Sequence, residues 1–101
     1  MLEVIENRED ACIRFYRQSA WVCEISYRLT QQTMEIQSIA CHAVEVMTEV
    51  LEELLILVDQ QYPWIERLEV LRKYPFDKAY RKIGFIHERR DLFVRHSVIS
   101  A

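Results

Sequence analysis

Residues 80–85 read Tyr-Arg-Lys-Ile-Gly-Phe, and this stretch decides how the C-terminal third of the chain folds. Phe76, Tyr80 and Ile83 are spaced four and three residues apart, which places their side chains on one face of a helix. Gly84 follows where such a helix would end in a left-handed cap. The spacing therefore predicts a short helix of about two turns that ends at Gly84.

Upstream of this helix, apolar and polar residues alternate with a period of two. This alternation predicts three strands, at Ala11–Arg17, Trp21–Thr30 and Thr33–Cys41, which could form an antiparallel meander. In the third strand the alternation assigns one face to Met34, Ile36 and Ser38, and the opposite face to Glu35, Gln37 and Ile39.

The period then changes to that of a helix. Residues 43–61 carry apolar side chains at helical spacing with glutamates opposite, so we expect a helix that ends before Pro63. A short strand, Ile65–Leu71, follows, and a helix-length connection between two strands suggests a parallel crossover. Pro75 stands where a first helical turn tolerates proline. The second half of Phe85–Val98 is expected to be the last strand. The predicted order is β-β-β-α-β-α-β, an α/β fold with one mixed sheet and helices packed on it.

The composition indicates a single small domain. The chain has 101 residues, half of them hydrophobic, which is enough for one core. Residues 1–10 are polar, and we expect an irregular lead-in before a single domain that spans residues 11–101. A domain of this size buries a modest fraction of its surface, so a partner subunit would help, and a homodimer is one expectation.

Charge and cysteine content exclude several classes of protein. The net charge of −3 argues against a nucleic-acid-binding protein, which needs a basic surface. The cysteines Cys12, Cys23 and Cys41 are odd in number and far apart, so we expect reduced thiols and no zinc site. No signal peptide or membrane-spanning run is visible. The sequence therefore predicts a cytoplasmic protein without membrane contact.

Residues 80–85 resemble the Y-x-K-[LI]-G-F signature near the C-terminus of the GNAT N-acetyltransferase superfamily. The predicted order of strands and helices over roughly residues 11–97 is similar to that of the same family. The resemblance implies transfer of an acetyl group from acetyl-CoA to an amine. It also implies that Tyr80 donates a proton to the leaving thiolate as general acid. Glu24 and Glu35 lie on neighbouring predicted strands, where a glutamate of the family acts as general base through water, and Glu35 is the candidate; an exposed strand glutamate is the alternative explanation. A tyrosine on one face with Phe76 and Ile83 is equally explained as a core residue.

The family's phosphate-binding loop, Q/R-x-x-G-x-G/A, should lie before the long helix. By position His42 takes the place of the basic residue, and Val44 and Val46 take the places of the glycines. Glycine lets backbone approach phosphate closely, whereas valine adds bulk and Glu45 adds a negative charge. The resemblance thus implies a cofactor-binding segment that departs from the family pattern, formed by His42, Ala43, Val44, Glu45 and Val46.

Three interpretations remain open at this point. The chain is an N-acetyltransferase that uses acetyl-CoA, or it is a non-catalytic GNAT-fold module that acts through a protein partner as a homodimer, or the match over residues 80–85 is a chance one in an unrelated α/β domain. No metal site is predicted, because the adjacent Cys41 and His42 would face opposite sides of a strand. The aromatic segment Tyr62–Trp64 serves either as a core plug or as part of a dimer patch.

Overall fold

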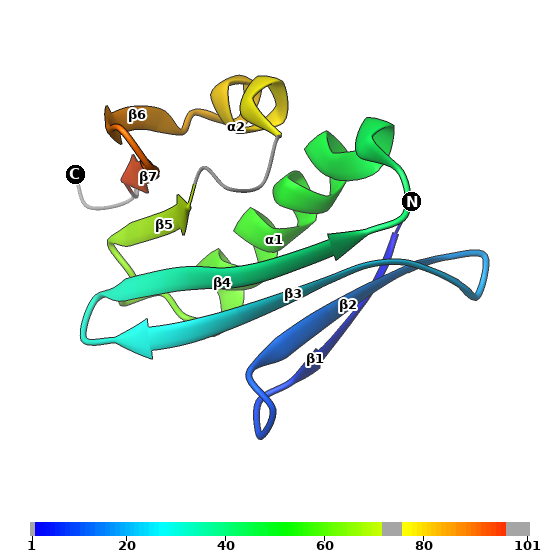
Figure 1. Ribbon diagram of the computed structural model, residues 1–101. Helices are drawn as coiled ribbons and strands as arrows, with labels where there is room; N and C mark the ends of the chain where they lie inside the picture. The colour runs from blue at the N-terminus through cyan, green and yellow to red at the C-terminus, as the bar shows by residue number, and fades with distance from the viewer. Residues whose placement is uncertain (1, 72–75, 97–101) are drawn as a thin grey trace.

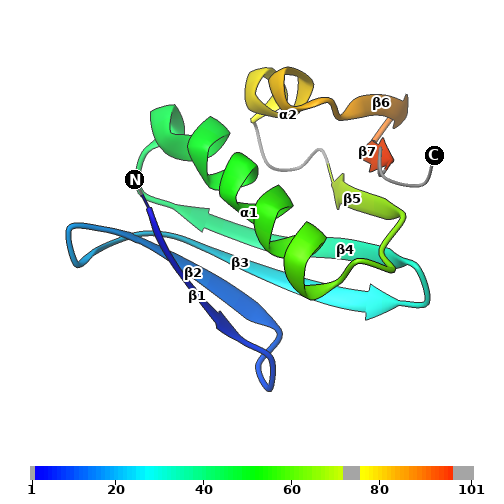
Figure 2. The same cartoon turned by 180° about the vertical axis from the view of Figure 1, so that it is seen from behind.

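The computed structural model describes residues 2–71 and 76–96. Seven strands in this part of the chain form one sheet in the order β1-β2-β3-β4-β5-β7-β6, and every neighbouring pair except β4–β5 is antiparallel. Helices α1 and α2 contact each other and pack against the sheet (Figures 1 and 2). The elements are β1 (Glu3–Asn7), β2 (Cys12–Arg17), β3 (Ala20–Thr30), β4 (Thr33–Cys41), a 3-10 turn η1 (Val44–Val46), α1 (Met47–Gln61), β5 (Arg67–Leu71), α2 (Asp77–Ile83), β6 (Ile86–Arg89) and β7 (Leu92–His96).

The predicted mixed α/β sheet with two helices packed on it is confirmed, and two strands are added to it. The expectation of an irregular lead-in was wrong for Glu3–Asn7, which pairs with β2 along its whole length. The alternation of apolar inward and polar outward residues is hard to recognise in this segment, because the inward position after Val4 is the charged Glu6. The hydrogen-bond partners of Glu6 are tyrosines distant in the chain. The predicted single last strand is in fact a hairpin of β6 and β7. All four residues of β6 are exposed, so the sequence shows no alternation there, and the strand is recognisable only by its pairing with β7. The predicted role of Pro75 lies outside the described residues.

One extra residue bends β4 at its middle. Ser26 pairs with Ser38 and Tyr27 pairs with Ile36, so Gln37 has no residue opposite it in β3 and forms a β-bulge. The bulge shifts the alternation by one residue, so that Ile39 joins Met34 and Ile36 in the core. The predicted faces of this strand were therefore wrong beyond Gln37: Ser38 is exposed and Ile39 is buried.

The bulge coincides with the point where β4 and β5 part. Their parallel register runs from Thr33 opposite Arg67 to Ile36 opposite Val70 and goes no further. In the described part of the chain, residues 38–41 of β4 pair with β3 alone. Figure 1 shows β5 beside only the first half of β4. The sheet is thus open on one edge of β4 from Gln37 onward.

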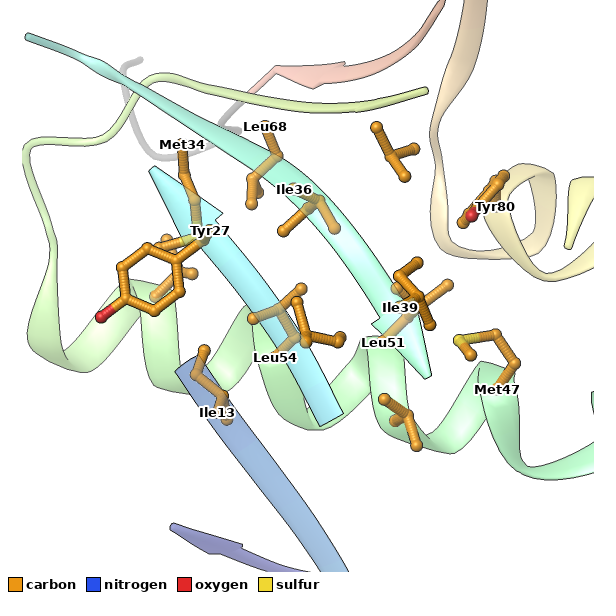
Figure 3. Packing of buried hydrophobic residues seen from close by; sticks show 14 of the residues in the cluster. Ile13, Tyr27, Met34, Ile36, Ile39, Met47, Leu51, Leu54, Leu68 and Tyr80 are labelled. Carbon is orange, nitrogen blue, oxygen red and sulfur yellow. The ribbon is translucent and has the colours of Figure 1, made fainter. Parts of the chain in front are cut away.

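The core lies between the sheet and the two helices. Helix α1 buries one stripe at helical spacing against the strands, and Tyr27 and Tyr80 lie at opposite ends of the cluster (Figure 3). Each large apolar side chain fully buried in this way contributes about 1.5–3 kcal/mol to folding. The buried residues of α1 are Met47, Val50, Leu51, Leu54 and Val58.

The end of α2 explains why residues 80–85 take this form. Gly84 has a positive φ of 103°, its N–H donates to the Arg81 carbonyl at 3.2 Å, and the Phe85 N–H donates to the Tyr80 carbonyl at 2.9 Å. This pair of bonds is a Schellman motif, which needs a left-handed residue and favours an apolar contact across the turn. The Tyr80 and Phe85 rings supply that contact, with centroids 5.7 Å apart. Arg95 adds a bond from its Nε to the Ile83 carbonyl, 3.0 Å away.

A buried hydrogen-bond network ties β1 to the body of the domain. The Glu6 carboxylate accepts hydrogen bonds from the Tyr27 hydroxyl, at 2.9 Å, and from the Tyr62 hydroxyl. The two hydroxyls are 3.0 Å apart, and the Glu6 side chain is only 12% exposed. Burial, followed by the bonds to Tyr62 and Glu6, raises the pKa of Tyr27 well above its ordinary value. The network therefore links strands β1 and β3 to the end of α1.

We predict that Gly84→Ala lowers the free energy of unfolding by about 1–2 kcal/mol, because an L-residue with a side chain resists a left-handed φ. A Cβ at this position would meet only the Arg95 Nε at 3.5 Å, an ordinary contact, so the cost is conformational rather than steric. Urea denaturation measures the loss. Gly84→Asn is the matched control and should lose less, since asparagine tolerates this conformation. Equal losses in the two variants would contradict the explanation.

We also predict that the domain loses stability as the pH rises above about 10. The pKa of Tyr27 is raised in the folded state, so the unfolded chain loses this proton at a lower pH than the folded chain does. The contribution of Tyr27 to stability is therefore complete below about pH 10 and declines as the pH rises further. Urea denaturation from about pH 9 to about pH 11 should show a shallower decline for Tyr27→Phe than for the wild type. An identical decline would show that this hydroxyl does not couple to folding.

Candidate functional site

A pocket of about 290 Å³ opens where β4 and β5 part. Glu35 and Glu69 stand directly opposite each other in the register of the two strands, so their side chains share the sheet face that points away from the helices. Two apolar side chains, Leu71 and Leu92, complete the wall beside them. The full lining is Glu35, Ile36, Gln37, Glu69, Val70, Leu71 and Leu92.

Each of the two carboxylates in this pocket accepts hydrogen bonds from a different arginine. Arg28 donates two bonds to Glu35, at 2.9 and 3.2 Å, and the Arg67 Nε donates to Glu69 at 2.6 Å. Arg67 also binds Glu88 at 2.8 Å, and this guanidinium lowers the pKa of Glu88. Like charges directly opposite each other destabilise a sheet. The arginines offset that repulsion from the sides, while the carboxylates stay only partly buried, at 29% and 24% exposure.

A second hollow, about 690 Å³ in volume, lies between the start of α1 and the start of α2. We call it the helix groove. Neither η1 nor α1 has a side-chain cap, but the turn of η1 already uses two backbone N–H groups, since those of Val46 and Met47 donate to the Ala43 and Val44 carbonyls. Only the N–H groups at the very start of η1, those of Val44 and Glu45, precede the first hydrogen bond of the turn. The residues that line the helix groove are Val44, Glu45, Thr48, Phe76, Asp77, Lys78 and Ala79.

The structure separates the five residues of the predicted cofactor segment. Val44 and Glu45 line the helix groove, and the Val44 side chain is 64% exposed there. His42 is held against β3: its N–H donates to the Val22 carbonyl at 2.9 Å, and its ring lies edge-on to Trp21 at 5.0 Å.

Ala43 and Val46 complete this segment but do not line the groove. Ala43 is extended, and its carbonyl accepts bonds from the Val46 N–H and the Cys41 thiol. The backbone of the segment has no positive φ, so valine meets no conformational penalty in place of glycine. Relative to the family pattern, Val44 adds side-chain bulk and Glu45 adds a negative charge at the mouth of the groove. Its ionisable lining groups are two carboxylates, Glu45 and Asp77, and one ammonium, Lys78.

Tyr80 is fully buried on the helix side of the sheet. Its ring packs among Phe76, Phe85 and Phe93 at centroid distances of 6.3, 5.7 and 5.2 Å. Phe93 pairs with Val70, the last residue of β5 that pairs with β4. Tyr80 therefore lies one strand away from the opening, while Glu35 lies on the other face of the sheet. The two predicted catalytic residues flank the opening and do not touch.

Sequence reasoning missed the bulge at Gln37 and the partner carboxylate, Glu69. A signal for the bulge exists, because the apolar residues Ile36 and Ile39 are three positions apart where a regular strand spaces them by two. Glu69 carries no such signal, because its place opposite Glu35 depends on the register between β4 and β5.

The described residues bring no group of three or more His, Cys, Asp or Glu side chains into metal-binding range. Within the same residues, neither helix has the length and apolar content required to cross a bilayer.

No protein-family model and no curated protein sequence matches the chain. Several solved structures, however, are similar to it in fold. GCN5 from Tetrahymena is similar with a TM-score of 0.66 at 16% identity, over 85% of this chain and 68% of that one. IAA acetyltransferase from Bacillus cereus gives a TM-score of 0.63 at 14% identity, over 96% and 99% of the two chains.

A third similar structure was solved with a ligand. The PaiA N-acetyltransferase from Thermoplasma acidophilum, in complex with coenzyme A, gives a TM-score of 0.59 at 15% identity, over 85% of this chain and 60% of that one. This chain thus spans less than two thirds of PaiA. At such low identities the likeness concerns the path of the chain, and it confirms the resemblance carried by residues 80–85: this chain has the fold of the GNAT N-acetyltransferases.

Proposed function

We propose that this chain binds acetyl-CoA at the opening between β4 and β5 and transfers the acetyl group to an amine. The observation that carries the proposal is the bulge at Gln37, which coincides with the end of pairing between the two strands; among the described residues, β4 has no strand neighbour on this edge from there to Cys41. The pocket that contains Glu35 and Glu69, which we call the carboxylate pocket, lies at the opening on one face of the sheet. The helix groove lies on the helix side, between the starts of α1 and α2. PaiA, which has the same fold, was solved with coenzyme A bound.

The open edge of β4 suits the amide-containing arm of coenzyme A. An unpaired strand edge offers backbone N–H and C=O groups to any extended chain that carries amides. At the end of β4, η1 has no side-chain cap, so the N–H groups that precede its first hydrogen bond, those of Val44 and Glu45, favour phosphate oxygens. Bound acetyl-CoA would supply an activated acyl group as a thioester. Val44 and Glu45 oppose phosphate at this end by bulk and by charge, so we expect weak binding.

The carboxylate pocket suits an aliphatic amine as acceptor. Glu35 and Glu69 attract a protonated amine to the opening, and Leu71 and Leu92 provide an apolar wall for its carbon chain. The amine must lose a proton before it attacks, and Glu35 is placed to accept this proton through water. Its bonds to Arg28 hold the carboxylate at the rim of the pocket.

Tyr80 is the candidate donor of a proton to the leaving thiolate. Its ring is fixed by three aromatic neighbours on the helix side, next to the last paired residues of β5. Burial keeps this hydroxyl away from water, so a proton that it gives up would pass to a bound group rather than to solvent. The placement of Glu35 and Tyr80 on opposite faces separates the acceptor side from the thiol side of the opening.

A second candidate function is that of a non-catalytic module that associates as a homodimer. The observation that favours it is the excess of carboxylates over ammonium groups in the helix groove, which opposes a pyrophosphate. The edge strand β6 is exposed at all four residues and could meet a second copy. A species larger than a monomer in sedimentation, together with no response to acetyl-CoA, would favour this module over the enzyme.

We predict that millimolar acetyl-CoA raises the melting temperature, because a ligand that binds only the folded state stabilises it. Glu45→Gln should bind about fivefold tighter, since it removes a negative charge near the phosphates. Glu52→Gln is the matched control, because it makes the same change at an exposed position of α1 outside the groove, and its affinity should equal that of the wild type. No thermal shift in any of the three proteins would contradict the proposal.

We predict that Tyr80→Phe lowers kcat for acetylation of an aliphatic diamine by about a hundredfold and leaves the acetyl-CoA thermal shift unchanged. The phenyl ring keeps the aromatic packing and removes only the proton donor. Tyr27→Phe makes the same change at the far end of the core and should leave kcat as in the wild type. Equal kcat in all three proteins would remove Tyr80 from the reaction.

A further inference from the structure

Two of the three cysteines face each other across neighbouring strands. Cys23 on β3 is the direct partner of Cys41 on β4 in the register of the pair. The next pair, Val22 and His42, is hydrogen-bonded, since the His42 N–H donates to the Val22 carbonyl at 2.9 Å. Such pairs alternate along an antiparallel ladder, so Cys23 and Cys41 form a non-hydrogen-bonded pair, in which Cα atoms are about 4.5 Å apart and side chains are closest. That separation lies within the range of about 4.4–6.8 Å found for disulfides.

The two thiols lie together at the edge of the core. Cys23 is fully buried and Cys41 is half-buried against the same cluster. Burial, followed by the neighbouring Cys41 thiol, raises the pKa of Cys23. The Cys41 Sγ also donates to the Ala43 carbonyl at 3.1 Å. Cys12 stands opposite Ser26, three positions further along β3, and pairs with no cysteine in the described part of the sheet.

We propose that Cys23 and Cys41 are a site of oxidative modification, at which hydrogen peroxide converts the two thiols into a cross-strand disulfide. The more exposed sulfur, Cys41, attacks the peroxide oxygen, which gives a sulfenic acid and releases one water. The Cys23 sulfur then attacks the Cys41 sulfur, the S–O bond breaks, and a second water leaves as the S–S bond forms. The two thiols lose two electrons and two protons in total, and the peroxide is reduced to two waters.

The position of this disulfide connects it to the start of the helix groove. Residue 41 is the last of β4, and the chain enters η1 three residues later. In the disulfide the Cys41 sulfur has no hydrogen left to donate, so the Ala43 carbonyl keeps only its bond from the Val46 N–H, 3.3 Å away. Oxidation thus fixes the end of β4 to β3 and changes the bonding at the first turn. The inference does not depend on acetyl transfer.

The test uses the full folded chain, hydrogen peroxide, thiol alkylation and peptide mapping. Trypsin separates the three cysteines, because Cys12, Cys23 and Cys41 fall in the fragments 9–14, 18–28 and 29–67. We expect a link between the second and third fragments, one alkylated thiol in the first, and a mass lower by two hydrogens. Closing this loop should raise the melting temperature by about 10 °C, and dithiothreitol should reverse the gain.

Matched variants sharpen the result. Cys12→Ser should keep the link and the thermal gain, whereas Cys41→Ser should lose both. The wild-type peptide map decides the question even if a variant folds poorly. Three alkylated thiols after peroxide treatment, sulfinic acids in place of the link, a link that involves Cys12, or a link between two chains would each overturn the proposal. The chain unfolded in urea, where the strand register is absent, should show no preference between pairs.

Discussion

The extra residue at Gln37 is the constraint on which the rest of the structure depends. A regular β4 would keep one alternation along its whole length, and Ile39 would face away from the core. The bulge bends β4 directly after Ile36, the last residue that pairs with β5, and in the described part of the chain residues 38–41 pair with β3 alone. Ile39 still reaches the core, because the shifted alternation returns an apolar residue to the inner face. The bulge thus coincides with the opening of the sheet and keeps the core intact.

Residues 80–85 have a structural role, the capping of α2, that does not depend on any catalytic role. Gly84 provides the left-handed residue, the two backbone bonds close the helix end, and the rings of Tyr80 and Phe85 pack across the turn. The same geometry buries the Tyr80 ring beside Phe93, which places it next to the end of the paired part of β5. A motif that caps a helix therefore also positions the residue proposed to act on the thiol side.

The charged side chains differ between the two sides of the opening. On the outer face, Glu35 and Glu69 stand opposite each other, and their arginines offset their charges. In the helix groove, the carboxylates Glu45 and Asp77 outnumber the ammonium group of Lys78. Under the proposed function, the electrostatic opposition therefore falls on the phosphates of the acyl donor and not on the acceptor amine. This imbalance is the physical basis for keeping a non-catalytic module as the second candidate.

The sequence by itself determined the features that depend on neighbours along the chain. Periodicity located β2, β3, β4 and α1, and the Gly84 cap located the end of α2, because side-chain alternation and capping act over a few residues. Only the tertiary structure decided that Glu3–Asn7 is a strand, because the inward Glu6 is compensated by Tyr27 and Tyr62 far along the chain. The same holds for the pairing of Glu35 with Glu69 and of Cys23 with Cys41, since strand register is set by the packing of the whole sheet and leaves no local trace.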